Sequence, residues 1–246
     1  MHRLFPFLQL TVVSSLFVTL SSCINYGYTG SGVLRTEIRD VSAFQSIAVY
    51  DGIEFVYTLN QTRPRHEVKV TLDDNLIRFV NAQVVNGRLD LRVMQALNPR
   101  QSVKVEISGP PLSGFSLSNK SRGTADTLTN LRQCSFDLSG GAQLSVNQLQ
   151  SDNASVQVST GAALTFLSGT VGNVNAKVFN NAKFNSEGMK SGRMELNVNQ
   201  WSQARVNVLN FLNVTLNDNS NVYYKGIPQI QQQILSNNSR LTPINE

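Results

Sequence analysis

The sequence predicts an all-β protein whose second half is a parallel β-solenoid, a stack of coils about 20 residues long. Two observations support this fold. From residue 115 onwards, apolar residues recur in pairs at a spacing of two, which places both members on one face of a strand. A four-residue bend with a small or flexible centre separates the pairs and occurs seven times. The bends are residues 118–121, 139–142, 159–162, 179–182, 199–202, 217–220 and 236–239.

The composition of the bends supports close stacking of the coils. The third bend residue is Gly or Asn in five of the seven bends, which suits a backbone that adopts positive φ. The fourth residue is always Ala or Ser, as expected where successive coils lie too close together for a larger side chain. We expect a right-handed β-helix, with a length of about 34 Å for seven coils spaced by about 4.8 Å.

The apolar pairs are expected to fill the interior of the solenoid, because one coil cannot bury its apolar face alone. The pairs before the bends are Phe115/Leu117, Phe136/Leu138, Val156/Val158, Ala176/Val178, Leu196/Val198 and Val214/Leu216. The residues after the bends are Leu144/Val146, Leu164/Phe166, Phe184, Ala204/Val206 and Val222/Tyr224. A calcium-binding roll does not fit, because its Gly-Gly-x-Gly-x-Asp run is not found after Gly140-Gly141.

Residues 35–114 are predicted to be β-rich but less regular, with antiparallel hairpins and the first coil of the solenoid. Asn86-Gly87 lies between apolar runs and is a strong signal for a two-residue hairpin, and Asp51-Gly52 is a second such signal. No linker separates this region from the solenoid at residues 115–246. We therefore expect one continuous elongated unit.

The start of the chain indicates export. Residues 1–3 form a short positive segment, residues 4–20 are mostly apolar, and small residues directly precede Cys23. This pattern resembles a bacterial lipoprotein signal, which implies that residues 1–22 are removed and that Cys23 carries the lipid that anchors the protein to a membrane. Residues 23–34 are then expected to form a flexible tether. The expected location is the bacterial cell envelope, facing the periplasm or on the outer-membrane surface.

Charge and cysteine content exclude several classes of function. Removal of residues 1–22 takes away Arg3 and leaves 20 basic and 16 acidic residues, a net charge of +4, and the basic residues are scattered. A nucleic-acid partner is therefore not expected, because it would require clustered basic residues. Besides Cys23 the chain has only Cys134, so the mature protein has no intramolecular disulfide. The inward register of Cys134 predicts a small buried hydrophobic side chain.

The sequence offers no set of catalytic or metal-binding residues. Beyond residue 22 the only histidine is His66, which we expect to be solvated, so a His-dependent triad or a multi-histidine metal site is excluded. On the repeat register Asp137 aligns with Gln157, Lys177 and Asn197, and Glu195 aligns with Ser135, Ser155, Asn175 and Asn213. No two acids are neighbours in such a row, so we predict no catalytic residue, no metal and no cofactor.

One acidic pair occurs in the first half of the chain, in the run Asp73-Asp74-Asn75. Its oxygen atoms suit a cation such as calcium. The run also directly precedes the apolar residues Leu76 and Ile77, as a turn would. We favour the structural turn over the cation site.

The outward positions of the solenoid carry amides and hydroxyls, which are the groups that contact carbohydrate or peptidoglycan. Gln143 and Lys183 are expected in one outward row, and Arg205 and Tyr223 in the next. Trp201 replaces Gly or Asn at a bend, where the indole is either exposed or inserted into the core. These five residues are the candidate ligand-contact surface. The alternative is that the stacked side chains hydrogen-bond only to one another and have a structural role.

Three segments together resemble the bacterial family called putative auto-transporter adhesin, head GIN domain. They read FQSIAVYDGIEFVYTLNQ, DDNLIRFVNAQVVNGRLDLRV and SVKVEISGPPLSGFSLS, and repeats of the FDLSGGAQL kind follow them. The resemblance covers roughly residues 39 to 240. It implies an envelope protein with an adhesin-like β-solenoid, and it supplies no catalytic residues to carry over. Fold alone does not establish function.

These observations predict a non-enzymatic, lipid-anchored envelope protein that binds a protein or glycan partner or serves as a scaffold. Its membrane contact is the lipid on Cys23, and homo-oligomers by stacking of coil ends or lateral packing are left open. One alternative is a polysaccharide-active β-helix enzyme, for which Asp73, Asp74 and Asp137 would be the first residues to mutate. A second alternative is a component of envelope signalling or stress sensing.

Overall fold

The computed structural model describes residues 27–62 and 64–244. The predicted signal at residues 1–22 and the predicted lipidation site Cys23 lie outside the described residues. The one helical element in the described part is the 3₁₀ helix η1 (Ile77–Phe79). Nothing helical in that part is long and apolar enough to cross a bilayer.

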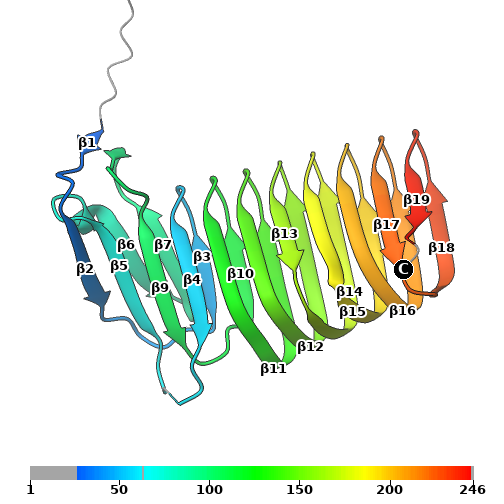
Figure 1. Ribbon diagram of the computed structural model, residues 1–246, viewed down its shortest axis with the longest axis horizontal. Coiled ribbons are helices and arrows are strands. Elements are labelled where there is room, and N and C mark those ends of the chain that lie inside the picture. Colours follow the sequence, from blue (N-terminus) through cyan, green and yellow to red (C-terminus); the bar gives the residue numbers. More distant parts are fainter. Residues whose placement is uncertain (1–26, 63, 245–246) are drawn as a thin grey trace, which may run out of the picture.

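The chain forms a rod of stacked coils, a parallel β-solenoid as predicted, and a single 17-stranded sheet winds around its core (Figure 1). The strands form two faces. Face I contains β6 (Val80–Val85), β7 (Arg88–Val93), β3 (Ser46–Val49), β10 (Gly114–Leu117), β14 (Gly169–Phe179), β18 (Gln229–Leu235) and the C-terminal halves of β11 (Arg122–Leu138), β12 (Gln143–Ser159), β15 (Lys183–Val198) and β16 (Gln203–Leu216).

Face II contains the N-terminal halves of the same four long strands, which turn a rounded corner from one face to the other. Its remaining strands are β2 (Leu34–Arg39), β5 (Glu67–Asp73), β9 (Lys104–Gly109), β4 (Glu54–Leu59), β13 (Ala163–Phe166), β17 (Asn221–Lys225) and β19 (Arg240–Pro243). The tight bends connect face I to face II and line the upper edge of the rod in Figure 1. Each coil therefore has one sharp edge and one rounded edge.

The backbone of every predicted bend adopts the positive φ that the sequence suggested. The third bend residue has φ between +59° and +74° in all seven bends, including Lys120 and Trp201, and the second bend residue is also positive in each. Two consecutive positive φ values are those of a type I′ turn. Neighbouring bends are hydrogen-bonded: the Gly141 N–H donates to the Thr160 carbonyl and the Gly161 N–H to the Asn180 carbonyl, both at 2.9 Å. The bends thus continue the hydrogen-bond ladder of the strands.

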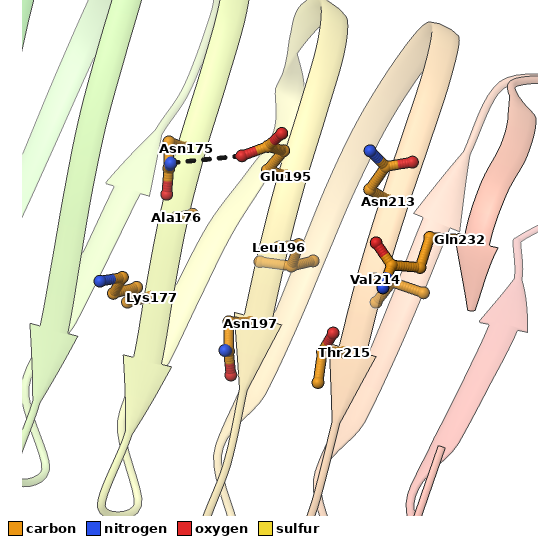
Figure 2. Close-up of a pocket in the computed structure, with 10 residues that line it drawn as sticks. All are labelled: Asn175, Ala176, Lys177, Glu195, Leu196, Asn197, Asn213, Val214, Thr215 and Gln232. Atoms are coloured by element: carbon orange, nitrogen blue, oxygen red, sulfur yellow. Dashed lines mark hydrogen bonds between the residues drawn. The ribbon is translucent and has the colours of Figure 1, made fainter. Parts of the chain in front are cut away.

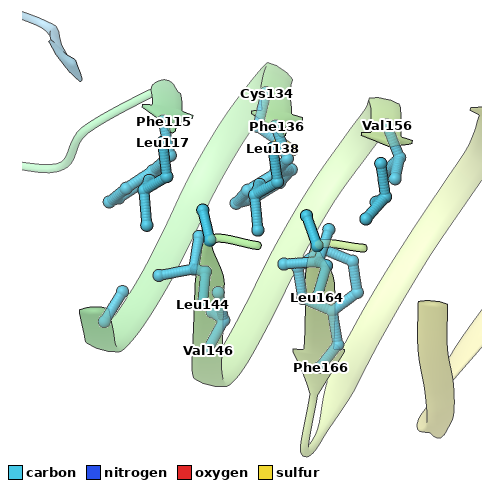
Figure 3. Close-up of a cluster of buried hydrophobic side chains, with 14 of the residues drawn as sticks. Phe115, Leu117, Cys134, Phe136, Leu138, Leu144, Val146, Val156, Leu164 and Phe166 are labelled. Carbon is cyan, nitrogen blue, oxygen red and sulfur yellow. The ribbon is translucent and has the colours of Figure 1, made fainter. Parts of the chain in front are cut away.

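The predicted inward residues form the core. All of them are buried except Tyr224, which is partly buried and packs against the core. Aromatic rings follow one another along the axis, with centroid distances of 6.1 Å from Tyr57 to Phe115, 5.6 Å to Phe136 and 4.9 Å from there to Phe166. Figure 3 shows this interior with the aliphatic neighbours Leu138 and Leu144. Stacking of coils buries these rings on both sides, which one coil alone does not achieve.

The N-terminal region differs from the prediction at one turn. Asn86-Gly87 connects the antiparallel pair β6 and β7, as predicted. Asp51-Gly52 has positive φ but makes no hairpin, because β3 pairs in parallel with β7 and β10 while β4 pairs in parallel with β9 and β11. It is a further solenoid bend, and its Gly52 N–H donates to the Asn119 carbonyl of the next bend at 2.9 Å. Coiling therefore begins at Ser46, and no boundary falls at residue 115.

The described part of the predicted tether, residues 27–34, is bound to the rod and does not form a free linker. The short strand β1 (Tyr28–Thr29) pairs in parallel with β8 (Leu97–Asn98). The Tyr28 ring stacks on Phe79 with a centroid distance of 4.7 Å. The chain then enters β2, which pairs antiparallel with β5. The prediction of a flexible tether at residues 23–34 is thus wrong for the described part, residues 27–34, because distant strand edges supply partners that composition does not reveal.

We predict that Ala162→Leu destabilises the protein by about 2 kcal/mol, because Ala162 is fully buried beneath a bend and stacked coils leave no room for added methylenes. Ala163→Leu is the matched control, since the next side chain points out of face II and is only partly buried. Its effect should stay within about 0.5 kcal/mol. Urea unfolding of both variants measures the difference, and equal destabilisation would show that the bends do not restrict side-chain size.

Candidate functional site

Four of the five predicted contact residues share the outer surface of face II. Gln143 and Lys183 lie in one row with Ala163 between them, as the register predicted. Arg205 is the row neighbour of Tyr223, and its guanidinium lies 5.5 Å from the centroid of the phenol ring. The same guanidinium is held by Glu187, with 2.7 Å between Nε and Oε2. Arg205 is therefore already engaged on both sides.

Trp201 does not join this surface. The residue occupies the third position of its bend with φ +62°, and its side chain is 69% exposed. Insertion of the indole into the core, one of the two predicted alternatives, is thereby excluded. Trp201 stands alone on the sharp edge of the rod, between the two faces.

A shallow groove of about 660 Å³ lies on face II, near the N-terminal coils. Its lining combines short or apolar residues, including Val56, Gly123 and Ala163, with the charged residues Glu54, Lys104, Glu106 and Arg122. Of the predicted contact residues only Gln143 lines it. Face II thus brings the predicted residues onto one surface without gathering them into one hollow.

A polar hollow of about 280 Å³ lies on face I, between β14, β15, β16 and β18 (Figure 2). Figure 2 shows Asn175, Glu195 and Asn213 at one level of three neighbouring strands, with a second polar row below them. The second row is Lys177, Asn197 and Thr215, and Gln232 of β18 closes the far side. Within each row the residues occupy the same repeat position in successive coils. Parallel pairing in register therefore places their side chains side by side.

Hydrogen-bonding capacity in this hollow is only partly used. The Asn175 amide donates to Glu195 Oε2 over 3.4 Å. The Oδ1 atom of Asn213 is buried and has no hydrogen-bond partner. Since a buried amide oxygen without a partner costs free energy, a rotation of this amide or an incoming donor would stabilise the hollow.

A second hollow of about 390 Å³ adjoins the first and shares Asn175 and Glu195 with it. It adds Asn153, Asn173 and Arg193 from the neighbouring row. The Asn173 amide donates to Asn153 Oδ1 at 3.0 Å. The Arg193 guanidinium lies over an aromatic ring, that of Phe211, at 4.9 Å. We call the residues of both hollows the polar strip; it crosses β11 to β18 on face I.

The chemistry of the polar strip is that of hydrogen bonding. Amides supply both donors and acceptors, Glu195 supplies an acceptor, and Lys177 and Arg193 supply donors. The predicted alignment of Asn175, Glu195 and Asn213 in one row is confirmed. Glu195 is the one acid among these three residues. The recurrence of Asn at one outward position was the available signal for a contact surface.

The carboxylates proposed for an alternative enzyme do not come together. Asp137 lies on face I, where it accepts from the Gln157 amide at 3.5 Å. Asp73 ends β5 on face II. Among the described residues, no group of three or more His, Cys, Asp or Glu side chains is arranged to hold a metal ion.

The run Asp73-Asp74-Asn75 clamps the N-terminal segment onto the rod. Asp73 is fully buried, and its carboxylate accepts from the backbone N–H of Gly32 at 2.6 Å and of Arg100 at 3.0 Å. Asp74 accepts from the Ser31 hydroxyl at 2.5 Å. Asn75 accepts from the Ser31 backbone N–H at 3.0 Å and donates to the Thr29 carbonyl at 2.9 Å. These side chains all have protein partners. The run is the structural turn that the sequence favoured, and it also holds the N-terminal segment on the rod.

His66 is partly buried and packed against the protein, whereas the sequence predicted a solvated side chain. Its ring stacks on Phe44 with centroids 4.0 Å apart, and its Nε2 lies 2.9 Å from the Pro110 carbonyl oxygen. Burial lowers the pKa of His66 below its usual value, and the contact to Pro110 opposes this shift only in part. The hydroxyl of buried Tyr57 donates to the same carbonyl at 2.7 Å. His66 is a packing residue at the N-terminal end of the rod.

Cys134 is buried in the core, as predicted, with 1% of its surface exposed. Burial raises the pKa of the Cys134 thiol to about 11. A thiol that stays protonated and is out of reach of solvent is not a nucleophile. Cys134 therefore belongs to the packing of the coil interior (Figure 3).

We predict that Asp73→Ala destabilises the protein by about 2 kcal/mol, because two backbone N–H groups lose a charged acceptor. Hydrogen exchange at Gly32 and Arg100 should accelerate in the same variant. Asp152→Ala is the control, since that side chain is exposed on a coil. Unchanged exchange at Gly32 would contradict the clamp.

We predict that His66 makes stability decrease in mildly acidic solution. The unfolded chain binds a proton near pH 6.5, whereas the folded chain does so only at lower pH, so stability is full above that value and is lost as pH falls below it. His66→Gln should lose this part of the pH dependence. Urea unfolding near pH 7.5 and near pH 5 measures the change in the free energy of unfolding. An equal change in the variant and the unchanged protein would show that His66 titrates alike in the folded and unfolded states.

Solved structures share this fold. Two are described as putative adhesins: one from Parabacteroides merdae (17% identity, TM-score 0.70, 89% of this chain and 99% of that chain covered) and one from Bacteroides fragilis (19% identity, TM-score 0.74, 88% and 98% covered). A third, described as a putative lipid binding protein, comes from Parabacteroides distasonis (15% identity, TM-score 0.66, 88% and 99% covered). At such identities the likeness establishes the fold and not the ligand.

No curated protein matches the sequence. The model of one family does match, over residues 43–228, and the family is described as putative auto-transporter adhesin, head GIN domain. The matched range begins before β3 and runs to the start of β18, so it includes most of the stacked coils described above. The chain therefore belongs to the putative auto-transporter adhesin, head GIN domain family.

Proposed function

We propose that this protein is a non-enzymatic, lipid-anchored module of the bacterial cell envelope that binds a glycan through the polar strip on face I. The observation that carries the proposal is the strip itself, in which amides of successive coils line two adjoining hollows around Glu195. The adhesin-like family and the similar folds support a binding role. A glycan offers many hydroxyl groups, each a donor and an acceptor, and matches a surface of amides with both capacities.

Rigidity supports a binding role for this surface. Asn175, Glu195 and Asn213 lie on strands that are paired on both sides, so their backbone is fixed before a ligand arrives. Preorganised groups lose less conformational entropy on binding than groups on a mobile loop. Neighbouring coils are about 4.8 Å apart, which allows consecutive side chains of one row to contact an extended ligand along the rod.

The proposed anchor suits a surface that projects from a membrane. The described chain starts at Gly27, and β1 lies at the N-terminal end of the rod (Figure 1). The clamp around Asp73 fixes this entry point. A lipid on Cys23 would therefore hold the rod by one end, with the polar strip several coils away from that end.

The same geometry supports binding over cleavage. Hydrolysis of a glycosidic bond by paired carboxylates requires two such groups flanking one bond. Asp137 is on face I, whereas Asp73 and Asp74 are engaged in the clamp at the end of β5. Glu195 has amides as row neighbours on both sides.

We predict that Asn175→Ala and Asn213→Ala each weaken glycan binding about tenfold, the effect of losing one hydrogen bond of about 1.4 kcal/mol. A glycan array with the purified protein identifies the ligand, and titration calorimetry measures the affinities. Gln143→Ala and Lys183→Ala, on face II, are the controls and should bind like the unchanged protein.

Weakened binding only in the face II controls would place the contact surface there and contradict the polar strip. Binding to no glycan on the array would refute the glycan proposal. Release of shortened sugars during the assay would refute the non-enzymatic role.

A further inference from the structure

The last coil of the rod presents strand edges without a partner in the described residues. β18 pairs only with β16, and β19 pairs only with β17. Backbone groups alternate in direction along a parallel strand. The Ser236 N–H donates to Leu216 of the preceding coil, so the N–H and C=O of Leu235 and Gln233 face the open side. Such a row of free backbone groups is a template for another strand.

The side chains of β18 do not protect this edge. Its seven residues read QIQQQIL and carry no charge and no proline. Leu235 is 38% exposed, whereas Leu216 and Val198, at the same position in the two preceding coils, are fully buried. Ile234 lies in an outward row and is 47% exposed. Uncharged, β-prone segments of this kind pair readily with other strands. Charged residues and proline are the usual protection of an edge strand.

Two other edges of the same sheet are protected. β2, at the N-terminal end of face II, carries Arg35, Glu37 and Arg39, and Glu37 bonds to both arginines at 3.2 and 2.9 Å. On β19, Pro243 faces the open side and lacks an N–H. Of these three edges, that of β18 is the unprotected one. At the opposite end of face I, β6 pairs only with β7 among the described residues and also lacks charge, so it is the internal comparison for β18.

We propose that a second copy of this chain covers the open coil, with β18 paired antiparallel to β18 of the second copy. A two-fold axis perpendicular to the faces reverses the strand direction and places identical edges opposite each other. Pairing with itself suits a strand without charge, because no like charges meet across the interface. The apolar residues Ile230, Leu235 and Leu241 at the end of the core would then cover those of the other copy. The product is one rod of doubled length with both anchored ends outward.

Gln233→Pro tests the pairing selectively. The Gln233 N–H faces the open edge, so its loss removes no hydrogen bond within the monomer, and proline is tolerated on edge strands in this orientation. We expect the purified protein to dimerise in sedimentation velocity runs and the dissociation constant of Gln233→Pro to rise at least about tenfold. Ile234→Lys should also weaken the dimer, because it places a like charge on each of the two paired strands. Circular dichroism confirms that each variant remains folded.

Val85→Lys is the matched control, since Val85 is 43% exposed on β6 at the opposite end of the rod. It should dimerise like the unchanged protein. Small-angle scattering should give a particle close to twice the monomer length. A monomer at high concentration, a dimer of unchanged length, or a dimer weakened only by Val85→Lys would each overturn the proposal. Failure of glycan binding would leave it unaffected, because β18 pairing does not depend on the ligand.

Discussion

Each coil of this protein must reverse direction within four residues while it stays at hydrogen-bonding distance from the coils on both sides. The type I′ bend meets this constraint, because two consecutive residues of positive φ turn the chain sharply and still direct the third N–H toward the next bend. Gly and Asn adopt this backbone at low cost, which explains their frequency in the bends. The buried Ala or Ser that follows, such as Ala142 or Ser121, lets the next coil approach.

Because the bends fix the register, every position of the repeat becomes a row along the rod. Inward rows become a continuous core, in which Phe115, Phe136 and Phe166 follow one another in contact. Outward rows become surfaces whose character depends on which side chains recur. On face I the recurring residue is Asn, and the polar strip around Glu195 results. Binding capacity in this fold is thus a consequence of stacking and needs no separate loop or domain.

The two ends of the rod differ in the contacts that surround the terminal strands of the sheet. At the N-terminal end, the paired charges of β2 protect the edge of face II, and the clamp at Asp73 and the ring of His66 add packing, whereas β6 leaves its outer edge open on face I within the described residues. At the other end, β18 and β19 leave their outer edges open within the described residues. An anchor at the N-terminal end and association at the C-terminal end would use both ends without occupying the faces, which remain available for a ligand.

The sequence by itself determined the period, the seven bends, the inward rows and the hairpin at Asn86-Gly87, because strand alternation and positive φ are properties of a few adjacent residues. It also aligned Asn175, Glu195 and Asn213 correctly, so the rows of the candidate site could be predicted. Only the tertiary structure decided that Asp51-Gly52 is a bend of the solenoid, that His66 packs on Phe44, and that the hollows lie on face I. These features depend on which distant segment lies alongside and on the lengths of side chains in neighbouring coils. A pattern of adjacent residues shows neither which distant segment is the neighbour nor how its side chains fill the space.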